Sequence, residues 1–128
     1  MFKNTIAISL VAVFLAFAGC SSMKYESAGT PAQMPEYSLG YLKVNYEKPI
    51  ADVYKATLAA YKDLGIAVTQ GKADSLTGIV AGTLADGTTA TTDLKAVTEK
   101  ETAVSIRVGT MGNRDFSYRI NERIKKHL

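Results

Sequence analysis

The sequence is poor in the residues that usually carry chemistry. In 128 residues it has one cysteine, one histidine and no tryptophan. A single cysteine cannot form a disulfide within the chain, and zinc sites use clusters of Cys and His. His127 lies beside the last residue, where helices fray and a third group could not easily orient it for catalysis. We therefore expect a protein that is not an enzyme, with no catalytic residue, no metal ion and no cofactor.

The sequence also lacks a strong charge and a second long hydrophobic run. It carries 15 Lys and Arg against 12 Asp and Glu, and these charges are interspersed along the chain. This balance does not favour nucleic acid as a partner. Asp74, Asp86 and Asp93 are spread through turns and strands without the spacing of a calcium loop. We interpret Asp74 and Asp86 as turn residues.

The one hydrophobic run stands at the beginning. Residues 5–18 carry no charge and follow Lys3. A bilayer-spanning helix needs roughly 20 residues, whereas the hydrophobic part of a secretory signal needs about 7 to 15 after a basic start. We predict that residues 1–19 are a signal peptide.

The run ends in Phe17-Ala18-Gly19-Cys20. This stretch resembles the bacterial lipobox, although Phe17 stands where Leu is usual. The resemblance implies cleavage before Cys20 and lipidation of its sulfur, with the membrane as a partner. Ser21 in place of Asp implies an outer-membrane location facing the periplasm, if the source is Gram-negative. The alternative is a free cysteine at the end of an uncleaved signal anchor.

The next segment shows neither a helical nor a strand period. Residues 20–40 hold Ser, Gly and Pro with few β-branched residues, which is typical of a flexible tether. We therefore expect a lipidated Cys20 and a tether over 20–40, followed by one folded domain over 41–128.

Periodic sequence begins at Tyr41. Apolar residues alternate over 41–46, then recur at helical spacing over 49–64, where Gly65 is placed to end the helix. Strand-like runs follow at 66–72, 78–84, 89–98 and 104–108, with Asp86-Gly87 predicting a type I′ hairpin. A last helix is expected from about Arg114. The pattern predicts an α+β fold, an antiparallel sheet of four to five strands with two helices packed on one face. The other face, which carries Lys43, Asn45, Ser105 and Arg107, should meet solvent.

Two features suggest where a partner could bind. The first is the glycine-bearing loop from Gly109 towards Ser117, which is either a phosphate-type loop or, as we prefer, a tight strand-to-helix connection. The second is the set of cations on the last helix, which either contact an anionic surface or are simply solvated. Together they give a candidate interaction surface made of Arg107, Asn113, Arg114, Arg119, Arg123 and Lys126.

Three stretches of the folded part are similar to a family of small bacterial lipoproteins classed as a domain of unknown function. They are "PIADVYKATLAAYKDLGI", "GIVAGTLADGT" and "SIRVGTMGNRDFSYRINERI". The resemblance implies a class and a cell-envelope location but no reaction. Ser117 could help to cap the last helix.

Our preferred hypothesis is a membrane-anchored envelope lipoprotein of unknown activity, a non-catalytic module that binds another envelope protein or a cell-wall polymer. The alternative is a small hydrolase or ligand-binding domain that uses the Gly109–Ser117 loop.

Overall fold

The computed structural model describes residues 34–128, so the predicted signal peptide, Cys20 and most of the predicted tether lie outside the described part. The described elements follow the chain in this order: β1 (Glu36–Ser38), β2 (Tyr41–Tyr46), α1 (Ile50–Asp63), β3 (Ala67–Ala73), β4 (Thr77–Thr83), β5 (Thr89–Thr98), β6 (Glu101–Val108) and α2 (Arg114–Lys126). Neither described helix is long and apolar enough to cross a bilayer.

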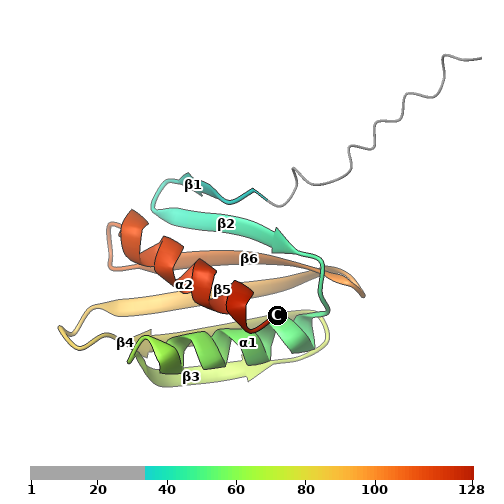
Figure 1. Cartoon of the computed structure of the whole chain (residues 1–128), viewed down its shortest axis with the longest axis horizontal. Helices are drawn as coiled ribbons and strands as arrows, with labels where there is room; N and C mark the ends of the chain where they lie inside the picture. Colours follow the sequence, from blue (N-terminus) through green and yellow to red (C-terminus); the bar gives the residue numbers. More distant parts are fainter. Residues whose placement is uncertain (1–33) are drawn as a thin grey trace, which may run out of the picture. The chain divides into compact units, whose positions relative to one another are not determined.

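The strands form one open antiparallel sheet in the order β1-β2-β6-β5-β4-β3. Both helices lie on the same face of this sheet (Figure 1). The predicted α+β class with two helices on one face is therefore confirmed. The number of strands is six, more than the four to five expected.

The additional strand is β1, which lies inside the segment expected to be a tether. Glu36–Ser38 pair with the start of β2 through a two-residue hairpin at Leu39 and Gly40, both at positive φ. Tyr37 is partly buried against the core. A three-residue strand is too short to show a period, which explains why the sequence placed the start of the folded part at residue 41.

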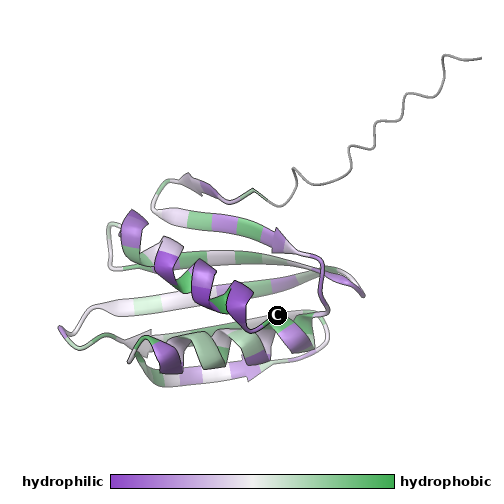
Figure 2. Ribbon diagram, in the orientation of Figure 1, coloured by the Kyte–Doolittle hydropathy of each residue, from purple (hydrophilic) through white to green (hydrophobic). Residues whose placement is uncertain are grey.

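The core lies between the sheet and the helices. Alternate residues of the inner strands point to this side, and Leu42, Ile106 and Val80 are fully buried in one cross-strand row. Apolar and polar residues accordingly alternate along β2 and β6 (Figure 2). Residues next to this row, such as Lys43 and Ser105, therefore face away from the helices. The expected exposed face exists, and both helices leave it uncovered.

Helix α1 begins and ends as its sequence indicates. Pro49 is the N-cap, one position before the first helical residue. At the other end Gly65 has φ +73, its amide donates to Lys62 O, and the Ile66 amide donates to Tyr61 O. This pair of bonds is a Schellman motif, and it turns the chain directly into β3.

The hairpin between β4 and β5 is correctly predicted in place but not in type. Only Gly87 has positive φ there, and its amide donates to Leu84 O, while the Leu84 amide donates to Thr88 O. A type I′ turn needs two residues at positive φ, so this is a type I turn followed by a left-handed glycine. Asp86 accepts from the Thr88 amide, which confirms it as a turn residue.

Candidate functional site

The loop between β6 and α2 is held by Arg107, the first residue of the predicted interaction surface. Its Nε donates to Gly109 O at 3.2 Å and Nη1 donates to Tyr41 Oη at 2.9 Å. A third bond runs from Nη2 to Thr110 O, and the guanidinium lies 4.8 Å from the centre of the Tyr41 ring. Most of its donors are thus engaged in fastening this loop to β2.

Asn113 caps helix α2. Its side-chain oxygen accepts from the Phe116 amide at 3.0 Å, the usual bond of an N-cap asparagine. Ser117, which was expected to help with capping, is fully buried, and its hydroxyl donates to Asn113 O at 2.8 Å. The residue that caps is therefore Asn113, because it alone has the extended backbone that precedes the helix.

The same loop packs closely on the β1–β2 hairpin through Gly112. This residue has φ +87, and a Cβ built on it would lie 2.6 Å from Gly40 Cα and 2.5 Å from Tyr37 Oη. Only glycine satisfies both the conformation and the space. The predicted strand-to-helix connection is thus also a backbone contact between two distant segments.

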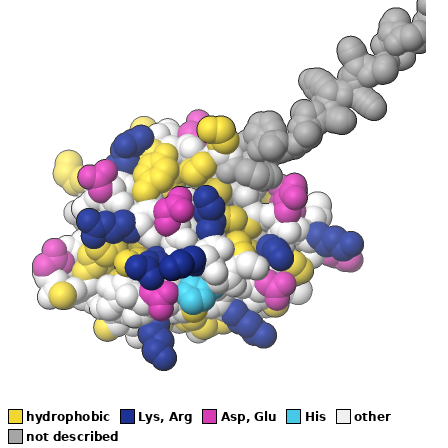
Figure 3. Space-filling model, in the orientation of Figure 1, with side chains coloured by type: hydrophobic (Ala, Val, Ile, Leu, Met, Phe, Trp, Pro, Cys, Tyr) yellow, Lys and Arg dark blue, Asp and Glu magenta, His cyan; other side chains and the backbone are white. Residues whose placement is uncertain are grey.

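The cations of α2 do not form one free patch. Arg123 lies 3.6 Å from Asp63 of α1, and His127 Nε2 lies 2.7 Å from the same carboxylate. The hydrogen bond from His127 is the main cause of a lowered pKa of Asp63, and the charges of His127 and Arg123 add to it. On the face shown in Figure 3, Lys and Arg side chains alternate with Asp and Glu.

The two other arginines of the helix rest on aromatic rings. The guanidinium of Arg114 is 5.1 Å from the Tyr118 ring centre, and that of Arg119 is 5.6 Å from the ring centre of Phe116. Lys126 is exposed, and its charge helps to lower the pKa of Asp63. The predicted surface residues of α2 are therefore mostly engaged within the protein: Arg123 contacts Asp63 of α1, and Arg114 and Arg119 pack on aromatic rings of their own helix.

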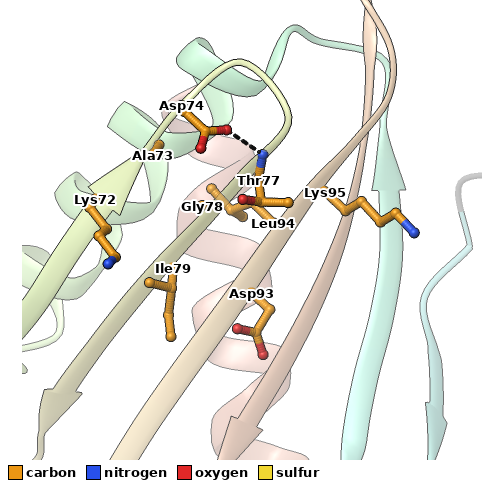
Figure 4. Close-up of a pocket in the computed structure, with 9 residues that line it drawn as sticks. All are labelled: Lys72, Ala73, Asp74, Thr77, Gly78, Ile79, Asp93, Leu94 and Lys95. Carbon is orange, nitrogen blue, oxygen red and sulfur yellow. Dashed lines mark hydrogen bonds between the residues drawn. The ribbon is translucent and has the colours of Figure 1, made fainter.

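A different group of residues gathers on the uncovered face of the sheet. Lys72 of β3, Ile79 of β4 and Asp93 of β5 stand in one cross-strand row, and their side chains point to the same side of the sheet (Figure 4). They line a hollow of about 680 Å³. The other lining residues are Ala73, Asp74, Thr77, Gly78, Leu94 and Lys95.

Asp93 is the unusual member of this hollow. Its carboxyl makes no hydrogen bond or ion pair with any residue of the described part, 34–128. Although the residue is exposed overall, partial burial of the carboxyl raises its pKa. By contrast, Asp74 at the rim accepts from the Leu76 and Thr77 amides, and these bonds lower its pKa.

A family model described as "Protein of unknown function (DUF3568)" matches residues 3–127. The chain belongs to this family. No curated protein matches it. The resemblance to a family of unknown function is therefore confirmed, and the DUF3568 match includes Cys20 and the hydrophobic run as well as the folded part.

The Asp93 hollow of this DUF3568 protein was not predicted from the sequence. One signal was present, because aspartate is depleted in strands and Asp93 stands within the Thr-rich β5. Its neighbours Lys72 and Ile79 come from other strands, so the register is needed to bring them together. Across residues 34–128 there is no group of three or more His, Cys, Asp or Glu side chains that could hold a metal ion.

Proposed function

We propose that this chain is a cell-envelope lipoprotein, anchored by acyl chains on Cys20, whose folded part binds another envelope component without catalysis. The N-terminal run and its cysteine support the anchor. Two acyl chains give lasting attachment where one anchors only marginally. The partner in this proposal is an envelope protein or a cell-wall polymer.

The observation that carries the binding role is the hollow around Asp93. A carboxylate that is partly desolvated and unpaired is stabilised when a cation or an N–H donor reaches it. Ile79 beside it offers apolar contact, while Lys72 and Lys95 offer positive charge. The hollow therefore suits a partner that brings an amine or amide donor to Asp93 and an acceptor to the lysines.

The contacts of Ser117 and His127 favour a non-catalytic binding role over a hydrolase that uses the Gly109–Ser117 loop. The Ser117 hydroxyl is buried and bonded to a backbone oxygen, and His127 is bonded to Asp63. A nucleophile needs a base within hydrogen-bond reach. Asp63 does orient the His127 ring, contrary to the expectation from its terminal position, but His127 has no hydrogen bond to a nucleophile among residues 34–128, and the Ser117 hydroxyl bonds to a backbone oxygen instead of a base.

The anchor is tested by Cys20→Ala. Cells expressing this variant and fed a palmitate analogue should yield unlabelled protein, because the sulfur that accepts the lipid is gone. Ser21→Ala, one position further along, should remain labelled and serves as the control. Label retained in the Cys20→Ala protein would remove the anchor from the proposal.

The binding face is tested by photo-cross-linking in intact cells of the native host. A photoreactive residue at Thr77, which lines the hollow, should give a discrete adduct, whereas one at Lys62 on α1 should not. A protein adduct migrates as a new band, and a wall-polymer adduct stays with the insoluble wall until glycan hydrolysis releases it. Equal adducts from both positions, or none from either, would contradict the proposed face.

Asp93→Asn separates binding from folding. The raised pKa means that the folded state disfavours the charged carboxylate. Removing that charge should leave the protein at least as stable at neutral pH, with an advantage that shrinks as the pH falls and Asp93 itself becomes neutral. The same substitution should abolish the Thr77 adduct. A variant that is less stable at neutral pH, or that cross-links normally, would count against the assigned role of Asp93.

A further inference from the structure

A second cavity lies where α2 packs against β2, and it shares no residue with the Asp93 hollow. Its volume is about 380 Å³, within the range of ~300 to 1,000 Å³ that is usual for small-molecule sites. It is lined by Pro35, Val44, Asn45, Tyr46, Glu47, Lys48, Asn121, Lys125 and Leu128. Apolar and charged side chains thus meet in one small space.

The deepest polar group at this cavity is Asn121. The residue is 0 % exposed, and its Oδ1 accepts a hydrogen bond from the hydroxyl of Tyr46. Its Nδ2 has no hydrogen-bond partner among residues 34–128. Buried polar groups are nearly always paired, and a leucine on this inner face of α2 would fill the space without that cost. The amide N–H is therefore a donor that the protein itself leaves unused.

The charges around the cavity indicate which acceptor fits. The Lys48 ammonium forms no ion pair within the described residues, and its backbone is fixed because its carbonyl accepts from Thr102 Oγ1 at 2.8 Å. Lys125 already pairs with Glu122 at 3.5 Å. Glu47, the acidic residue of the lining, also has an interaction partner of its own. Lys48 is thus available to bind an anion, next to the neutral N–H donor of Asn121.

We propose that this cavity binds a small carboxylate with a short apolar tail. The carboxylate accepts from Asn121 Nδ2 and lies near the Lys48 ammonium, while the tail lies against Val44 and Leu128. Because the nitrogen is shielded from solvent, entry requires neighbouring side chains to shift. The site is independent of the partner proposed for the sheet face.

The test is an NMR titration of the ¹⁵N-labelled full chain in detergent micelles, with sodium butanoate as the probe. Butanoate should shift the Asn121 side-chain N–H resonances saturably, whereas butylammonium and 1-butanol should not. Lys48→Gln should weaken butanoate binding about tenfold, the effect of losing one charge contact. The matched control Lys62→Gln, at the far end of α1, should bind as the unchanged chain does.

Asn121→Leu should abolish the binding of butanoate. If that variant fails to fold, the resonances of Asn121 in the unchanged chain and in Lys48→Gln still decide the matter. Three results would each overturn the proposal: Asn121 resonances that butanoate does not move, equal shifts with butylammonium, or tight binding by Asn121→Leu. A water seen at the Asn121 N–H groups that butanoate does not displace would overturn it as well.

Discussion

Gly112→Ala adds very few atoms, yet we expect it to destabilise this fold strongly. It adds a single methyl group at a residue with φ +87, and that group would lie 2.6 Å from Gly40 Cα and 2.7 Å from Gly40 O. These neighbours are backbone atoms, so they cannot turn away as a side chain would. The β6–α2 loop and the β1–β2 hairpin would have to separate.

The magnitude follows from two contributions. A non-glycine residue in the left-handed region costs about 1–2 kcal/mol, and overpacking adds about 1–3 kcal/mol. We expect Gly112→Ala to lower the free energy of unfolding by about 3 kcal/mol. The matched control is Gly87→Ala, because Gly87 has φ +91 but nothing within 4 Å of the added carbon. That variant should lose only the first contribution, about 1 kcal/mol.

The assay is urea denaturation of both variants beside the unchanged chain, with hydrogen exchange to locate the change. The exchange of β1 and β2 amides should accelerate in Gly112→Ala and stay unchanged in Gly87→Ala. Tyr37→Phe in the Gly112→Ala background removes the contact with Tyr37 Oη but not those with Gly40, so it should restore only a small part of the loss. Equal destabilisation by the two alanines would refute the reasoning, because the close backbone approach would then contribute nothing.

Two further predictions concern helix ends. Asn113→Ala should lower the free energy of unfolding by about 1 kcal/mol, because it removes the cap bond to Phe116. Asn113→Asp should retain most of that stability, because an aspartate can accept the same bond. Thermal unfolding of both variants measures the difference, and similar losses in both would argue against a capping role. The lowered pKa of Asp63 means that its bonds to His127 and Arg123 stabilise the fold above the ordinary carboxyl pKa and that this contribution is lost as pH falls through the folded value. Asp63→Asn should therefore flatten the acid side of the stability profile measured by denaturant titration at several pH values, and an unchanged profile would contradict the assignment.

Most of the fold could be read from the sequence because its elements are long enough to show a period. The strand over 41–46 and the helix from Arg114 both lie where alternation and four-residue spacing placed them. β1 could not be found in this way. It has three residues, and its hairpin places Leu39 at φ 54, where Asn or Gly would have been the recognisable signal.

The candidate sites were harder to predict because their residues meet only through tertiary structure. The spacing of Arg119 and Arg123 indicates a shared helix face, but it cannot show that Asp63 of another helix lies opposite Arg123. In the same way, the unused amide of Asn121 depends on its single bond to Tyr46, which is 75 positions away. A sequence period describes one element at a time and carries no information about such pairs.

The two edge strands of the sheet affect how the protein behaves at high concentration. One rim is the short β1, and the other is β3, whose pairing with β4 shifts between Val68 and Gln70. A bulge of this kind twists the strand, so a flat strand from another molecule cannot form a continuous row of backbone hydrogen bonds with it. Many copies crowded together are therefore hindered from pairing edge to edge into fibres.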